Sequence, residues 1–526
     1  MTGPWWKSAI LYQVYPRSFQ DSDGDGIGDL RGITARLPYL AELGVDALWL
    51  SPVFVSPMAD FGYDVSDYTA VDPLFGSMAD FDALLHAAHA RGLKVLLDFV
   101  PNHTSDQHPW FRESRASRTN AKRDWYVWRD GAPGGGPPNN WLSEFGGSAW
   151  EYDELTGQYY YHAFLSAQPD LNWRNPAVRA AMHDVLRFWL GRGVDGFRVD
   201  VIWHLIKDAA FRDNPPNPDF RAGDPPHRRQ LPFYSADQPE VHELIRELRV
   251  VVDEFPARLL IGEIYLPLER LVAYYGRELD GVHLPFNFSL LETPWNARAV
   301  ADLIDRYEAL LPPGAWPNWV LGNHDRPRIA SRIGQAQARI AAILLLTLRG
   351  TPTLYYSDEI GLPQVPIPAD RIRDPFERNL PGLGRDGCRT PMQWDASPGA
   401  GFSSSPPWLP LSEDAPLRNV ARQRDDPGSL YNVYRRLIGL RRQFAALATG
   451  HYRPIPADDD VLAYIREQGS ERFLVALNFG PSPALLMLPP EYHGTVMLSL
   501  GADRMGEMVR ERVYLAGDDG VMVALD

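Results

Sequence analysis

The sequence predicts an α/β fold, a (β/α)8 barrel with an inserted subdomain and a C-terminal all-β domain. Short apolar runs alternate with helical patterns over most of the chain, which is typical of parallel strands joined by crossover helices. This alternation breaks after the third strand and resumes near residue 171, and beyond residue 450 only short strand patterns remain. The predicted units are therefore the barrel (1–103 and 171–450), the insert (104–170) and the C-terminal β-sandwich domain (451–526).

Eight apolar runs are the candidate barrel strands, at residues 10–15, 47–50, 93–100, 196–199, 259–263, 282–288, 319–322 and 353–356. Helices are expected at 33–43, 79–91, 176–192, 239–254 and 431–444. Catalytic residues of such barrels come from the C-terminal ends of the strands. The acidic and basic residues that follow the strands are therefore the first candidates for function.

The insert and the C-terminal domain are predicted from their irregular composition. Residues 104–170 contain a glycine- and proline-rich stretch at 134–138, several tryptophans and three consecutive tyrosines at 159–161. A loop of this length without its own fold would be uncommon. Strands of the C-terminal domain are expected at 461–466, 473–479, 484–488, 495–500 and 521–525. The segment 214–226 is too rich in proline to be helical.

Composition limits the class of protein. The 526 residues carry a net charge of −15, which argues against nucleic acid or an anionic membrane as a partner. The longest apolar run, 340–348, is too short to span a bilayer. The single cysteine, Cys388, allows no intrachain disulfide, and the first residues lack the apolar core of a signal peptide. A soluble cytoplasmic protein is expected.

The fourth predicted strand ends on a charged pair. It lies in Gly-Val-Asp-Gly-Phe-Arg-Val-Asp-Val, residues 193–201. Side chains alternate along a strand, so Arg198 and Asp200 point to the same side. Arg198 would keep Asp200 ionised and fix its direction, as a nucleophilic carboxylate requires. Taken alone, this stretch is explained better by a structural ion pair.

Two more acids follow barrel strands, Glu263 and Asp325. If the charged residues at the strand ends were purely structural, they would be expected on both rims of the barrel. Here three acids, two histidines and an arginine are predicted on one rim. Cleavage of a glycoside with retention needs two carboxyl groups about 5–5.5 Å apart, one that attacks and one that donates a proton. Asp200 suits the nucleophile, Glu263 the acid/base and Asp325 a third carboxylate that binds sugar hydroxyls.

Aspartates alternate with other residues, mostly glycines, after the first strand. Asp21, Asp23, Asp25 and Asp29, with a backbone carbonyl near Ile27, offer oxygen ligands at alternate positions. Such ligands suit a hard cation such as Ca²⁺, here in a structural role. A solvated acidic turn is the alternative, but the strict spacing favours a metal. No organic cofactor is expected.

Together these stretches resemble an α-glucosidase of glycoside hydrolase family 13, the α-amylase family. Four motifs carry the resemblance: Asp-Phe-Val-Pro-Asn-His (98–103), Gly-Phe-Arg-Val-Asp (196–200), Gly-Glu-Ile (262–264) and Asn-His-Asp (323–325). The resemblance covers essentially the whole chain. It implies that Asp200 is the nucleophile, Glu263 the acid/base and Asp325 the transition-state stabiliser. It also implies that the aspartate loop binds Ca²⁺, as in many relatives.

The resemblance further implies which residues surround the non-reducing glucose. The expected pocket residues are Asp60, Tyr63, His103, Arg198, His324 and Arg389, with Phe164 and Gln168 at its border. Some of these have ordinary alternatives. Tyr63 alone would more often be a packing residue, and Phe164 fits the core as well as the site.

The preferred linkage is left open by the residues near the leaving group. Gln-Pro-Asp-Leu-Asn (168–172) is similar to the motif of the oligo-1,6-glucosidase branch. In relatives, Val at position 201 accompanies α-1,6 linkages and Ala or Thr α-1,4 linkages. One methyl group gives only about 1–3 kcal/mol of discrimination, so Val201 predicts mixed specificity. The chain departs from this branch at Trp203-His204, where an Asn-aromatic pair is usual, at Arg326, where Gln is usual, and in segment 214–226.

The expected activity is that of an exo-acting retaining α-glucosidase on short maltose- or isomaltose-type sugars, with transglucosylation as a side reaction. One alternative is a trehalose- or sucrose-acting transferase or isomerase of the same family. Another is a non-catalytic carbohydrate-binding or transporter-associated member, which the presence of all three acids disfavours. Linkage, chain-length limit and oligomeric state are left open.

Overall fold

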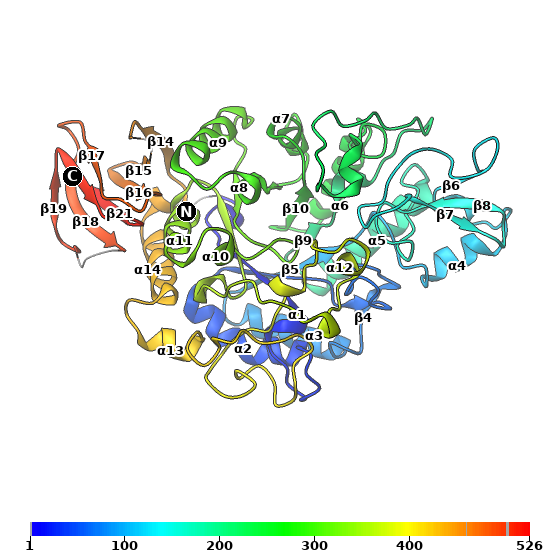
Figure 1. Ribbon diagram of the computed structural model, residues 1–526, viewed down its shortest axis with the longest axis horizontal. Coiled ribbons are helices and arrows are strands. Elements are labelled where there is room, and N and C mark those ends of the chain that lie inside the picture. The colour runs from blue at the N-terminus through cyan, green and yellow to red at the C-terminus, as the bar shows by residue number, and fades with distance from the viewer. Residues whose placement is uncertain (1–2, 459, 501–503) are drawn as a thin grey trace.

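The computed structural model describes residues 3–458, 460–500 and 504–526 (Figure 1). Residues 1 and 2, which begin the stretch that lacks a signal-peptide pattern, lie outside these ranges. The predicted fold class is confirmed. A parallel eight-stranded sheet has the order β11-β10-β9-β5-β2-β1-β13-β12, and contacts between β11 and β12 close it. The barrel strands are β1 (Leu11–Val14), β2 (Ala47–Leu50), β5 (Lys94–Phe99), β9 (Gly196–Val199), β10 (Leu259–Ile264), β11 (Leu284–Asn287), β12 (Asn318–Val320) and β13 (Thr351–Tyr355).

Long helices follow or precede the barrel strands. They are α2 (Leu30–Leu43), α3 (Met78–His89), α5 (Pro176–Arg192), α6 (Val241–Asp253), α9 (Ala297–Leu310), α11 (Gln335–Thr347) and α14 (Leu430–Gln443). Their ends carry sequence signals. Helix α3 begins with a capping box between Ser77 and Asp80, and α5 begins after Asn175, whose side chain accepts from the second residue of the helix. Helix α5 ends at Gly193 (φ 110°), a left-handed conformation that glycine adopts without strain.

Shorter elements connect these parts. The short α-helices are α1 (Pro16–Phe19), α4 (Pro109–Ala116), α7 (Leu268–Leu271), α8 (Ser289–Glu292), α10 (Ile329–Arg332), α12 (Pro375–Asn379), α13 (Val420–Asp425) and α15 (Ala445–Ala448). The 3-10 helices are η1 (Trp5–Lys7), η2 (Arg123–Trp125), η3 (Ile202–His204), η4 (Pro226–Arg229), η5 (Val272–Tyr275), η6 (Asp358–Ile360), η7 (Ala369–Arg371) and η8 (Asp386–Cys388). Among the described residues, none of these helices has the length and apolarity needed to cross a bilayer.

Two small sheets and a second eight-stranded sheet complete the fold. The hairpin β3 (Phe54–Val55) and β4 (Asp67–Val71) follows β2, and β6 (Trp128–Arg129), β7 (Trp150–Asp153) and β8 (Gln158–Tyr161) form a sheet inside the predicted insert. An antiparallel sheet ends the chain: β14 (His451–Ile455), β15 (Val461–Gln468), β16 (Glu471–Asn478), β17 (Ala484–Met487), β18 (His493–Ser499), β19 (Met508–Arg510), β20 (Arg512–Leu515) and β21 (Gly520–Leu525). The insert and this C-terminal sheet lie on opposite sides of the barrel (Figure 1). The exact domain limits stay predictions.

Candidate active site

A cavity of about 1180 Å³ opens where the barrel strands end. Ten of the twelve residues expected to act on or bind sugar line it: Asp60, Tyr63, His103, Phe164, Gln168, Asp200, Val201, Glu263, His324 and Asp325. The other two, Arg198 and Arg389, are fully buried behind the acids and do not line the cavity. The structure therefore brings all twelve residues together, but the two arginines contact the catalytic acids and do not face the cavity.

Arg198 holds three carboxyl groups. Its Nη1 donates to Asp98 Oδ1 (2.7 Å) and Asp200 Oδ1 (2.6 Å), and its Nη2 lies 2.7 Å from Glu263 Oε2. The barrel explains this geometry, because β5, β9 and β10 are neighbouring strands and Asp98 is in register with Arg198. Asp98 also accepts from Trp49 Nε1 (3.1 Å).

The charge of this cluster depends on more groups than the Arg198–Asp200 pair that the sequence predicts. Burial raises the pKa of Asp200 well above its usual range, against the opposing effect of Arg198, and the nearby Glu263 and Asp98 raise it further. Burial likewise raises the pKa of Asp98. Three carboxyl groups share one guanidinium away from water, so retention of a proton within the cluster is favoured. Arg198 fixes the direction of Asp200, but it does not alone decide its charge.

Val201 links the two acids through a strained backbone. It lies just after Asp200 with φ 35° and ψ 45°, a left-handed conformation that is unfavourable for a β-branched residue. In this conformation its N–H donates to Glu263 Oε2 (2.9 Å). Since Oε2 also faces Arg198, a proton on Glu263 is best accommodated on Oε1. Val201 thus positions Glu263 in addition to lining the cavity.

Asp325 lies among three positively charged or polar neighbours. Its carboxylate is 3.2 Å from His324 Nε2 and accepts from Arg385 Nη1 (3.1 Å) and Arg389 Nη2 (3.0 Å). Burial acts to raise the pKa of Asp325, but His324 and the two arginines outweigh it and hold this pKa well below its usual range. Asp325 is therefore ionised at neutral pH.

Arg385 is a site residue that the sequence analysis missed. Its Nη2 donates to Asp60 Oδ1 (2.6 Å) and Asp374 Oδ1 (2.8 Å), while its Nη1 reaches Asp325. It therefore joins two predicted pocket acids that are 265 positions apart in the sequence. The available signal was its place four residues before Arg389, in Arg-Asp-Gly-Cys-Arg. Asp98 was also missed as a partner of Arg198, although its motif was recognised.

The remaining pocket residues form a connected wall. Tyr63 Oη donates to Asp98 Oδ2 (2.9 Å), and its ring stacks on His324 with centroids 5.2 Å apart and planes inclined by 2°. Gln168 Nε2 donates to Asp60 Oδ2 (3.3 Å). The centroid of Phe164 lies 5.1 Å from that of His103, and burial lowers the pKa of His103 to about 4, so its imidazole is neutral.

The cavity extends beyond the predicted residues toward segment 214–233. No α-helix forms at 214–226, as its prolines indicate. This part of the cavity is lined by residues outside the predicted glucose pocket, of which the sequence analysis had placed Trp203, His204 and Arg326 near the leaving group: Trp203, His204, Asn217, His227, Arg228, Phe233, Tyr265, Phe288, Glu292 and Arg326. Tyr265 stacks on Phe288 with centroids 4.4 Å apart and planes inclined by 6°, which gives this region an aromatic surface.

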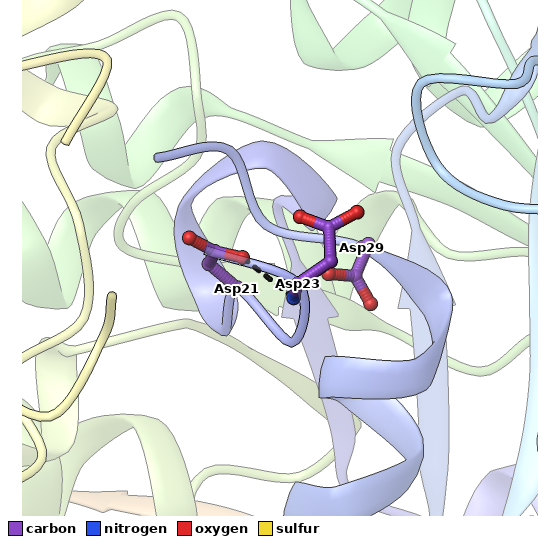
Figure 2. A group of neighbouring side chains, drawn as sticks. All are labelled: Asp21, Asp23 and Asp29. Atoms are coloured by element: carbon purple, nitrogen blue, oxygen red, sulfur yellow. Dashed lines mark hydrogen bonds between the residues drawn. The ribbon is translucent and has the colours of Figure 1, made fainter. Parts of the chain in front are cut away.

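The aspartate loop brings three of its carboxylates together (Figure 2). Oxygens of Asp21, Asp23 and Asp29 all lie within 4.8 Å of one another. Asp25 is outside this group, and its Oδ1 accepts from the N–H of Ile27 (2.7 Å). Asp21 also accepts from backbone N–H groups of the loop, such as that of Gly24 (2.7 Å). Converging hard oxygen ligands fit a cation such as Ca²⁺.

A (β/α)8 barrel with paired carboxyl groups at the C-terminal ends of its strands suits an enzyme that cleaves glycosidic bonds. Comparison with known proteins specifies it further. Residues 13–450 match the family model of the alpha amylase catalytic domain, so the chain belongs to the alpha-amylase family, as its motifs predict.

The relatives are similar over nearly their whole length. A probable alpha-glucosidase of Rhizobium meliloti is 46% identical, with 92% of this chain and 91% of the relative covered. An oligo-1,6-glucosidase of Parageobacillus thermoglucosidasius is 40% identical, with 92% of each covered. The solved structure of an alpha-glucosyl transfer enzyme, XgtA, is 43% identical with a TM-score of 0.94 and full coverage of both chains. That of trehalulose synthase MutB from Pseudomonas mesoacidophila is 36% identical with a TM-score of 0.92, again covering both chains fully.

Proposed function

We propose that this protein is a retaining α-glucosidase that releases glucose from the non-reducing end of short α-glucosides. The observation that carries the proposal is the shared guanidinium of Arg198, which holds Asp200 and Glu263 on adjacent strand ends. Two carboxyl groups so closely placed suit a double displacement through a covalent intermediate. The similarity to proteins named alpha-glucosidase and oligo-1,6-glucosidase supports the same activity.

In the first step, the proton shared by the cluster lies on Glu263, and the carboxylate of Asp200 attacks the anomeric carbon while the glycosidic C–O bond breaks. Glu263 gives its proton to the leaving oxygen, which departs as the alcohol of the aglycone. In the second step, Glu263 takes a proton from water, whose oxygen displaces Asp200 and releases glucose with its original configuration. Oε1 of Glu263 is the oxygen suited to this proton, since Oε2 faces Arg198 and the N–H of Val201.

We assign the rest of the pocket to binding of the terminal glucose. Asp325 stays ionised and can accept hydrogen bonds from ring hydroxyls that strengthen as the ring distorts. Asp60 and Asp325 are held by Arg385, so the carboxylates keep fixed positions around the sugar. Tyr63, His103, Phe164, Gln168 and His324 complete the wall, and Arg389 supports Asp325 from behind.

A second reaction follows from the same intermediate. A sugar hydroxyl that replaces water would produce transglucosylation, and similarity to an alpha-glucosyl transfer enzyme and to a trehalulose synthase supports this side activity or a dedicated transferase.

We further propose that the Asp21 loop binds Ca²⁺ in a structural role, and that the protein acts on small oligosaccharides in the cytoplasm. Metal analysis of purified protein and fractionation of the source cells would test the last two proposals.

A substrate panel tests the function. Glucose release from maltose, isomaltose, trehalose, sucrose and kojibiose is measured at equal concentrations, with Asp200→Ala as the inactive control. The proposal predicts release from maltose or isomaltose that is abolished in the variant. Conversion of sucrose or trehalose to an isomeric disaccharide without net glucose release would favour the isomerase instead. Near-normal turnover by Asp200→Ala would reject the nucleophile.

A further inference from the structure

Three charged side chains meet at the extended part of the cavity and have no role in the reaction described above. Arg326 Nη2 donates to Glu292 Oε1 (3.2 Å), and Arg228 Nη2 lies 3.8 Å from the same oxygen. Arg326 follows β12, Glu292 is the last residue of α8, and Arg228 belongs to η4 next to the proline-rich segment. All three line the cavity. Three separate stretches of chain are thus joined by one carboxylate.

The position of Arg326 relates it to the leaving group. Its guanidinium lies over the ring of Tyr265, 5.1 Å from the centroid. Tyr265 comes two residues after Glu263, the proposed proton donor, which must sit beside the leaving oxygen. Arg326 also directly follows Asp325. The aglycone of a bound glucoside would therefore pass beside Arg326 and the Tyr265–Phe288 stack.

The exposure of these side chains differs from that of the other arginines of the site. The side chains of Arg326, Glu292 and Arg228 are 35%, 53% and 52% exposed, whereas Arg198 and Arg389 are almost completely buried. An exposed ion pair of this kind contributes little to stability. Its N–H groups and carboxylate oxygens can consequently exchange partners with a ligand at low cost.

We propose that Arg326 and Glu292 form a recognition pair for the hydroxyl groups of the aglycone sugar. This inference rests on the proposed function. A guanidinium donates in a fixed plane and a carboxylate only accepts, so the two side by side match neighbouring hydroxyls that act as acceptor and donor. The Tyr265–Phe288 stack offers an apolar face for the sugar ring. Arg228 approaches Glu292 from the side of the proline-rich segment, so a second guanidinium faces the same carboxylate at this end of the cavity.

The pair distinguishes substrates by their aglycone. A disaccharide presents hydroxyl groups there, whereas p-nitrophenyl α-glucoside presents an aromatic ring without them. Hydrogen bonds to charged groups contribute about 1.5–3 kcal/mol, so loss of one is expected to lower kcat/KM for the disaccharide by roughly ten-fold or more. This hydrogen bond is lost equally from the enzyme–substrate complex and from the transition state. The fall in kcat/KM should therefore arise mainly from a higher KM.

The test compares Arg326→Gln and Glu292→Gln with wild type on maltose, isomaltose and p-nitrophenyl α-glucoside. The matched control is Arg306→Gln, which removes a guanidinium from an exposed pair with Glu269 that does not line the cavity. The inference predicts a loss of about ten-fold on the better disaccharide, mainly in KM, against about two-fold or less on the aryl glucoside, and no change in the control.

Two results would overturn the recognition pair. Unchanged disaccharide kinetics in both variants would mean that the pair does not contact the aglycone, and an equal loss on disaccharide and aryl glucoside would mean that it serves structure or the glucose side. The aryl glucoside also distinguishes a failure of the recognition pair from a failure of the proposed α-glucosidase function. If wild type fails to cleave every substrate, the proposed function fails, and the recognition pair fails with it.

Discussion

Replacement of Arg385 by methionine tests the charged side of the pocket. Methionine keeps much of the side-chain length and removes the guanidinium that contacts Asp60, Asp325 and Asp374. The three acids would not be affected equally. Asp325 keeps Arg389, and Asp374 keeps backbone donors such as the N–H of residue 385 (2.6 Å). Among the described residues, the hydrogen bond that the Asp60 carboxyl group keeps is the longer one from Gln168 (3.3 Å). Asp60 is therefore the residue most disturbed by Arg385→Met.

The size of the effect follows from burial. Asp60 is 5% exposed, and burial raises its pKa while Arg385 and Arg389 oppose that shift. Removal of one partner from a buried, hydrogen-bonded charge pair costs about 2–5 kcal/mol. If Asp60 binds the terminal glucose, kcat/KM should fall by roughly 30-fold to several thousand-fold. Because Arg385 lowers the pKa of Asp60, its loss should also move the acidic limb of the kcat/KM profile to higher pH.

The assay is the pH dependence of kcat/KM on p-nitrophenyl α-glucoside, with circular dichroism to confirm folding. Arg378→Met is the control, since Arg378 is an exposed arginine of the same segment whose guanidinium donates to the carbonyl of Ile372. A folded Arg385→Met with kcat/KM within a few-fold of wild type would refute the reasoning. So would an acidic limb that moves to lower pH.

Three further predictions concern separate groups. Glu263→Gln should still form the covalent intermediate from an activated aryl glucoside but slow disaccharides by about 100-fold or more, and equal losses would count against its acid role. Burial raises the pKa of Asp358 from 3.8 to about 7, so the stability it contributes while protonated is lost as pH rises through that window. The melting temperature of Asp358→Asn should accordingly vary less between pH 4 and 7 than that of wild type, and identical slopes would contradict this. Chelation should lower the melting temperature of wild type but not that of Asp21→Asn, and no effect on wild type would reject the metal.

Much of the fold was predictable because the barrel strands are apolar runs with clear ends. The predicted helix at 176–192 coincides with α5, and Asp200, Glu263 and Asp325 fall on one rim as expected. The strands β14, β19 and β20 were not predicted. They are three to five residues long and bury few side chains (in β19, Val509 alone), so too few apolar positions are present to predict a strand from the sequence.

Two missed residues, Arg385 and Glu292, share a physical cause. Arg385 contacts Asp60, 325 positions away, and Glu292 contacts Arg326 from a different strand end, so both contacts depend on closure of the barrel. The charge balance around Arg198 also needed the structure. Sequence spacing showed that Arg198 and Asp200 share a direction, but only the barrel shows that Asp98 and Glu263 share the same guanidinium.

The central claim, cleavage with retention through Asp200 and Glu263, is tested most directly by the configuration of the released sugar. Proton NMR during the first minutes of p-nitrophenyl α-glucoside hydrolysis reports the anomer before mutarotation, and all glucose comes from the cleaved residue. Two displacements at the anomeric carbon predict α-glucose as the initial product. Initial formation of β-glucose would contradict the double displacement and the roles assigned to both acids.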